Sequence, residues 1–141
     1  MAGSLIRILA KSDFVATAVG TTAMEVPLGD FDARIFTTLA LIGRIHAKSA
    51  STGSNQTVNL YFRNLAPSAD DIAADFAALT SLCTATFTMN GGTTGVQLPQ
   101  IVAPGAGTVI SYRVRLILAY SQSVAGTVFT FSLSADGLGR E

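Results

Sequence analysis

Three aspartates lie close together in the sequence and are the first candidates for chemistry. Asp70, Asp71 and Asp75 fall in a stretch with few other charges. Carboxylates at this spacing could bind a metal ion or act as an acid and a base. On a helix, however, Asp70 would point about 100° away from Asp71. No histidine or glutamate lies nearby, and the ligand spacing of a calcium loop is absent. We therefore expect neither a metal site nor a catalytic pair here.

The same aspartates fit the start of a short helix. Apolar residues recur at i, i+4 and i+7, which is one face of a helix: Ile72, Phe76 and Leu79. Ser68 occupies the N-cap position, and Asp71 lies three residues later as its capping-box partner. Negative side chains in a first helical turn stabilise it by about 0.3–1 kcal/mol each. We predict one short helix near residues 68–80, with Ser68 and Asp71 as its cap.

Few other residues are candidates for catalysis, because His46 is the only histidine and Cys83 the only cysteine. His46 shares a predicted strand face with Arg44 and Lys48, so we expect a solvated and cationic imidazole. No G-x-S-x-G motif indicates a serine hydrolase. A single cysteine permits neither an intrachain disulfide nor a Cys-based zinc site. The sequence predicts no catalytic residue, no metal ligand and no cofactor, and we expect that the protein is not an enzyme.

The composition of the chain limits the kinds of structure and partner that we expect, because few of its residues are charged. The chain has 141 residues and no net charge; 13% of its residues are charged and 49% hydrophobic. This length favours one domain. A neutral surface has little self-repulsion and tends to associate with other proteins. The nine basic residues are scattered without a run, which argues against a nucleic-acid partner. The longest apolar run, residues 35–43, is about half of what a bilayer requires, so we expect no membrane partner.

Alternating apolar and polar residues dominate the chain and indicate strands. The pattern is clearest in the segments TVNLYFRN, TATFTM and GTVFTFSLSAD. Turn signals separate these segments, and the strongest is Asn90-Gly91, since both residues tolerate a positive φ. Counting the segments between turns predicts an all-β fold, a single jelly roll or β-sandwich of about eight antiparallel strands.

Two groups of residues are candidates for contacts with other proteins. Residues 1–20 form either an N-terminal arm or the first strand of the sandwich, and residues 21–141 form the sandwich domain. The segment 1–20 is apolar on both faces, as expected for a strand that pairs with a sheet edge or packs between chains, and its contact candidates are Leu5, Ile6, Ile8, Leu9 and Phe14. Arg113 and Arg115 share one strand face. They could meet carboxylates of a neighbouring subunit or keep that face hydrated.

A neutral β-domain rich in Thr, Ala, Val and Gly, with Gly/Asn turns and one short helix, resembles jelly-roll or β-sandwich virion proteins. It is most similar to the capsid decoration (cement) proteins of tailed bacteriophages, over roughly residues 33–136. The resemblance implies a homotrimer that binds the major capsid protein, bridges neighbouring shell subunits and stabilises the shell. It implies a location on the capsid surface of the virion, after synthesis in the host cytoplasm. No residue-level signature carries over from that family.

Three other functions compete with decoration. The chain could be another virion component, such as a coat, neck or tail protein, although a packaging coat would normally carry a basic arm. It could be a carbohydrate-binding β-sandwich, but Trp is absent, and Tyr61, Tyr112 and Tyr120 lie within predicted strands. The last is a metal-dependent enzyme on a jelly-roll scaffold, as in the cupins. Such a site needs several histidines, and this chain has one.

Overall fold

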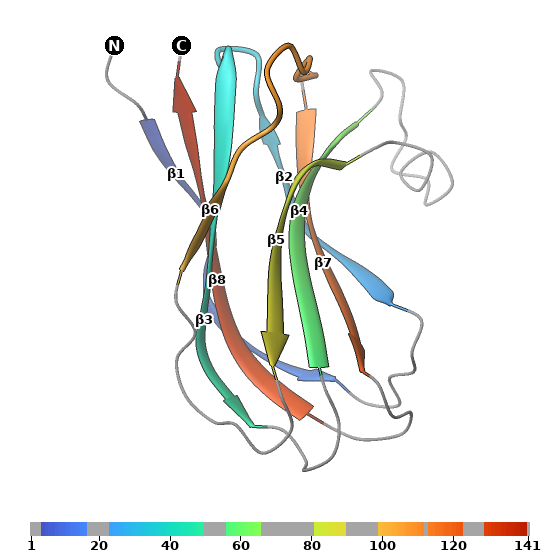
Figure 1. The fold of residues 1–141 in the computed structure, drawn as a ribbon. Coiled ribbons are helices and arrows are strands. Elements are labelled where there is room, and N and C mark those ends of the chain that lie inside the picture. The colour runs from blue at the N-terminus through green and yellow to red at the C-terminus, as the bar shows by residue number, and fades with distance from the viewer. Residues whose placement is uncertain are drawn as a thin grey trace.

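The computed structural model of the chain describes residues 4–16, 23–49, 56–65, 81–89, 99–111, 113–122 and 129–140. These residues form eight strands (Figure 1): β1 (Ser4–Ala16), β2 (Met24–Asp32), β3 (Thr38–Ser49), β4 (Gln56–Asn64), β5 (Ser81–Met89), β6 (Gln100–Val102), β7 (Arg113–Gln122) and β8 (Phe129–Arg140). The predicted helix near 68–80 and its cap, Ser68 and Asp71, lie outside the described residues.

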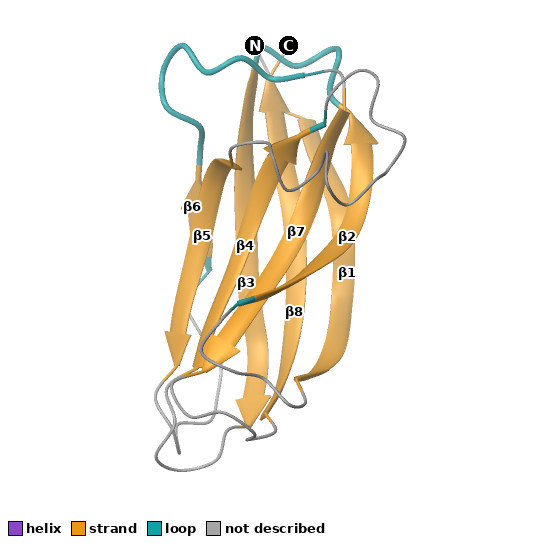
Figure 2. Ribbon diagram, turned by 90° about the vertical axis from the view of Figure 1, so that its right-hand side faces the viewer, coloured by secondary structure: helices purple, strands orange, loops and turns teal. Residues whose placement is uncertain are grey.

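The strands pair as a long hairpin that has been rolled into two layers. β1 pairs with β8, β2 with β7, β3 with β6 and β4 with β5, all antiparallel. Two further antiparallel pairings, β3 with β8 and β4 with β7, join these pairs into two sheets. Sheet A has the order β1-β8-β3-β6, and sheet B has the order β2-β7-β4-β5. Successive hairpin pairs thus alternate between the sheets, which is a jelly-roll arrangement. Figure 2 shows sheet B in front of sheet A.

The core lies between the two sheets and confirms the predicted all-β fold. The apolar positions of the alternating segments point inward and are fully buried in β4, where Val58, Leu60 and Phe62 lie. On β5 the threonines are exposed, whereas Ala85 and Phe87 are buried. Strands alternate in this way because successive side chains point to opposite faces. The alternation in the sequence therefore identified the core face of each of these strands.

Two glycines permit a close approach to the inner face of sheet A. A Cβ atom on Gly43 of β3 would lie 2.9 Å from the Leu60 side chain across the sandwich. A Cβ atom on Gly139 of β8 would overlap the ring of Phe36, which is buried just before β3. Glycine therefore occupies both positions, because a side chain there would have to displace packed neighbours.

A side chain links the two sheets at one edge of the sandwich, where β6 borders sheet A and β5 borders sheet B. The Gln100 side chain on β6 accepts a hydrogen bond from the Thr86 backbone N–H at 3.1 Å, and its amide nitrogen donates to the Thr86 carbonyl. Gln100 thus pairs with β5 as a peptide group would. It satisfies part of an edge strand that would otherwise expose backbone donors and acceptors.

Candidate functional site

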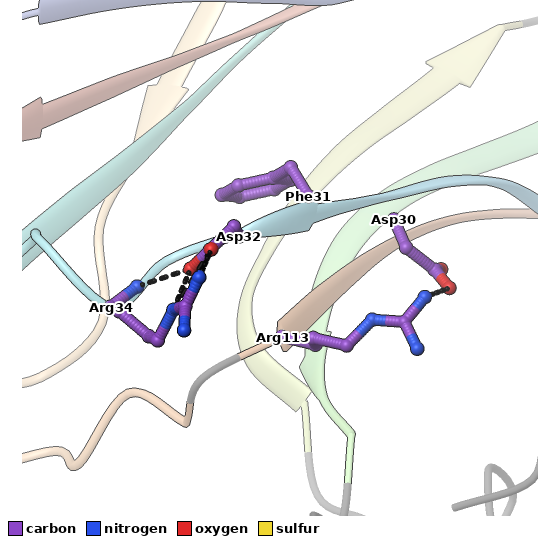
Figure 3. Close-up of a pocket in the computed structure, with 5 residues that line it drawn as sticks. All are labelled: Asp30, Phe31, Asp32, Arg34 and Arg113. Carbon is purple, nitrogen blue, oxygen red and sulfur yellow. Dashed lines mark hydrogen bonds and ion pairs between the residues drawn. The ribbon is translucent and has the colours of Figure 1, made fainter.

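The outer face of sheet B carries a cluster of arginines and carboxylates at the end of β2 and the start of β7. Asp30 lies opposite Arg115 and Asp32 opposite Arg113 in the register of these two strands. Because side chains alternate along a strand, all four lie on the outer face. Figure 3 shows Phe31 on the other side of β2 from Asp30 and Asp32. The strand register therefore brings opposite charges together in pairs.

Asp30 accepts hydrogen bonds from two arginines of β7. The Arg115 guanidinium is bidentate, with Nε 2.5 Å from Oδ1 and Nη2 2.8 Å from Oδ2 of Asp30. Arg113 Nη2 lies 3.0 Å from Oδ2. The Arg115 side chain is 10% exposed and that of Asp30 is 17% exposed. The hydrogen bond from Arg115 holds the pKa of Asp30 below its usual value, although burial acts in the opposite direction. Asp30 is therefore ionised at neutral pH.

A second pair completes a surface hollow of about 390 Å³ lined by Asp30, Phe31, Asp32, Arg34 and Arg113 (Figure 3). Arg34 Nε lies 3.0 and 2.9 Å from the two carboxylate oxygens of Asp32, and its backbone N–H also donates to Asp32 at 3.0 Å. These hydrogen bonds lower the pKa of Asp32. Two carboxylates held ionised by arginines are poor proton donors. The arrangement therefore favours polar recognition over acid catalysis.

Further along the same face, Tyr61 is buried and cannot serve as a platform for sugar stacking. Its hydroxyl donates a hydrogen bond to Glu25, and the Arg63 guanidinium carbon lies 5.0 Å from the centre of its ring. Burial, together with this hydrogen bond, raises the pKa of the Tyr61 hydroxyl far above its ordinary value. Tyr61 packs with a small apolar cluster, Leu65, Ile117 and Ala119, on the outer side of sheet B. This face is therefore partly apolar and partly charge-paired.

His46 lies on the outer face of sheet A and forms a contact that sequence spacing does not reveal. Its Nε2 atom is 2.7 Å from Oγ of Ser134, which lies 88 positions away. Burial first, and then the charges of Lys11, Arg44 and Arg7, lower the pKa of His46. The expectation of a cationic imidazole is therefore wrong, because His46 is partly desolvated among cations. These cations also disfavour the imidazolium that a Ser–His mechanism must form.

The remaining side chains that could react or bind a metal ion form no such site in the described part of the chain. The thiol of Cys83 is buried, and burial raises its pKa to about 11, so it is protonated at neutral pH. No three His, Cys, Asp or Glu side chains of the described residues gather as a metal site. Among these residues there is also no helix with the length and apolar character to span a bilayer.

The structure separates the predicted contact residues into distinct environments. Residues 4–16 form β1, in which Leu5 is 63% exposed. The other apolar candidates of β1 are partly buried against the protein's own core: Ile6, Ile8, Leu9 and Phe14. Arg113 and Arg115 pair with Asp30 of the same chain. Of these candidates, Leu5 and the more exposed of the two arginines, Arg113, are accessible to a partner.

No protein-family model matches the chain, and no curated protein is similar to it in sequence. Among solved structures, a chain in the structure of infectious bursal disease virus, Gx strain, aligns with 96% of this chain at 16% identity and a TM-score of 0.53. This chain spans 31% of the length of that viral chain.

Two further structures align with nearly all of this chain but with lower structural scores. One is a Bacillus endospore appendage, at 13% identity over 100% of this chain and 95% of its own, with a TM-score of 0.39. The other is turnip yellow mosaic virus, at 13% identity over 94% of this chain and 81% of its own, with a TM-score of 0.31. The alignment with the infectious bursal disease virus chain is therefore the one that bears on the fold, and at its low identity it shows the fold alone.

Proposed function

We propose that this chain is a virion structural protein that decorates a capsid shell as a homotrimer bound to the major capsid protein. The observation that carries the proposal is the strand arrangement. Nearly the whole chain follows the fold of one part of a chain in a virus structure. A rigid double sheet suits a cement protein, since such a protein acts by adding buried area across joints between shell subunits.

The surface chemistry supports a binding role over a catalytic one. The described carboxylates on the outer face of sheet B lie against arginines of the same chain. Paired charges of this kind give an interface specificity more than affinity. β1 is an edge strand of its sheet, and it exposes apolar side chains near both ends: Leu5 and Val15, which are 63% and 62% exposed. We infer that the β1 edge contributes to the trimer contact.

The mass of the protein in solution tests the proposal. Sedimentation velocity of the wild type should show a trimer, and Leu5→Asp and Val15→Asp should shift the population toward monomer. Ile101→Asp is the matched control, because Ile101 is similarly exposed, at 69%, but lies on β6 at the opposite edge of sheet A. A wild-type monomer would contradict the trimer, and loss of the trimer only in the Ile101 variant would contradict the β1 contact.

Binding to shells tests the decoration role separately. Purified protein mixed with undecorated capsids should co-sediment with them and raise the temperature at which the shells disassemble. A protein that self-assembles into closed shells without a partner would instead be a coat protein. That second function is favoured by one observation, because the fold gathers basic residues that the sequence scatters: Arg7, Lys11 and Arg44.

A further inference from the structure

The outer face of sheet A contains a hollow of about 240 Å³ in which basic side chains from two strands converge. Arg7 and Lys11 come from β1, and Arg44 comes from β3. Ile42 and Pro99 form part of its apolar wall. β8 lies between β1 and β3 in the sheet, so these cations face one another across it. We call this site the basic hollow.

The basic hollow has an excess of positive charge. Asp136 is the single carboxylate among the described residues that line it, and it pairs with Arg7. Within the described part of the chain, neither Lys11 nor Arg44 has an ion-pair partner, and their side chains are exposed. The three cations and the one carboxylate of this lining sum to a net charge of +2 when His46 is uncharged. Unlike the charge-paired face of sheet B, this hollow therefore has capacity for an anion.

His46 lies among the same cations and is a neutral hydrogen-bonding group within the basic hollow. Its imidazole lines the basic hollow and is held at 2.7 Å from the Ser134 hydroxyl. The groups that face it are Arg7 and Lys11 from β1, Arg44 from its own strand, and Ser134 and Asp136 from β8. After burial, the three cations are what lower the pKa of His46. An anion bound beside the ring would offset them and add a charge-assisted acceptor.

We propose that the basic hollow binds a phosphate group. At neutral pH a phosphate monoester or inorganic phosphate carries a charge of about −1.5 to −2, which matches the excess charge of the lining residues. Guanidinium groups present planar pairs of donors that suit phosphate oxygens, and a lysine adds a point charge. The Ser134 hydroxyl and the imidazole supply further hydrogen-bonding groups. This inference does not depend on the proposed decoration role.

Titration with inorganic phosphate tests the site. Because His46 is the only histidine, one imidazole resonance in the NMR spectrum reports on the basic hollow. At low ionic strength, phosphate should shift this resonance saturably and raise the pKa of His46. Arg44→Gln should weaken binding about tenfold or more, since it removes one charged donor. Arg34→Gln is the control, because Arg34 lies between β2 and β3, pairs with Asp32 at the end of β2 and does not line the basic hollow; this variant should change the dissociation constant less than about twofold.

The source of the phosphate group is distinguished by a second ligand. If the hollow recognises phosphates of a nucleic-acid chain, a short single-stranded oligonucleotide should bind more tightly than inorganic phosphate. The slope of the logarithm of its binding constant against the logarithm of the salt concentration should then decrease in magnitude by about one in Arg44→Gln. If it recognises free phosphate, the oligonucleotide should bind no more tightly. The proposal is overturned if neither ligand perturbs the His46 resonance, or if Arg34→Gln weakens binding as much as Arg44→Gln while both variants retain the wild-type thermal unfolding transition.

Discussion

Asp30 and Arg115 form the best-buried ion pair among the described residues. Asp30 also accepts a hydrogen bond from Arg113, so one carboxylate satisfies two arginines. Removing one partner of a buried pair leaves the other charge desolvated without compensation, which costs more than the intact pair contributes. The two strands that carry this pair, β2 and β7, are therefore locked in register by side chains as well as by their backbones.

We expect Asp30→Asn to lower the free energy of unfolding by about 2–3 kcal/mol, because it removes the carboxylate that forms a bidentate ion pair with the nearly buried guanidinium of Arg115. The stabilisation from a carboxylate with a lowered pKa is complete above its unfolded pKa of 3.8 and is lost as the pH falls through the lower folded value. Urea unfolding at a series of pH values should therefore show a smaller loss of stability on acidification in Asp30→Asn than in the wild type.

Asp32→Asn provides the comparison for this effect. Asp32 also has a lowered pKa, but its pairing with Arg34 is exposed to solvent, where ion pairs contribute little. Its variant should follow the wild-type acid profile closely. Equal acid profiles for the wild type and Asp30→Asn would show that the Asp30 pair does not stabilise the fold.

At the scale of the strands, packing on the inner face of sheet A depends on a glycine, which has no side chain. Gly139 on β8 lies against the ring of Phe36, and its neighbours on β1 and β3 pair with it through the backbone. Extra atoms in a well-packed core force side chains off their rotamers. The position beside Phe36 therefore requires glycine for reasons of space.

We expect Gly139→Ala to destabilise the protein by about 1–3 kcal/mol, because the new methyl group must displace the Phe36 ring. Chemical denaturation measures this change. Gly29→Ala on β2 is the matched control, since no atom lies within 4 Å of the added Cβ, and it should change stability by less than about 0.5 kcal/mol. A Gly139→Ala variant as stable as the control would mean that Phe36 repacks freely.

For the molecule as a whole, the jelly-roll order makes the fold depend on contacts between distant parts of the chain. The first strand pairs with the last, so Ser4 lies opposite Gly139. Among the strands that the structure describes, only the β4–β5 pair joins strands that are consecutive in the chain. Closing such long loops costs entropy before the contacts form.

We expect slow refolding, on a time scale of about milliseconds to seconds, because topologies dominated by distant pairings fold slowly. Stopped-flow dilution from urea, followed by tyrosine fluorescence, measures this rate. Refolding in microseconds would show that local structure, and not the pairing of β1 with β8, limits the reaction.

The sequence by itself determined the strands and their faces. Alternation at β4 and β5 is a local pattern, and it predicts which side chains enter the core regardless of which strands pair. Part of the charged site also has a local signal. Asp30 and Asp32 enclose Phe31, and Arg113 and Arg115 enclose Val114, so two oppositely charged segments of period two could have been recognised as cross-strand partners.

The tertiary structure alone decided which strands became neighbours and which scattered charges met. Arg7 and Arg44 are far apart in the sequence, yet β8 brings both to one hollow beside His46 and Asp136. No local pattern encodes this meeting, because strand order and register arise from the packing of the whole chain. The sequence positions of these basic residues therefore did not predict an anion site, because only the folded sheets bring the residues together.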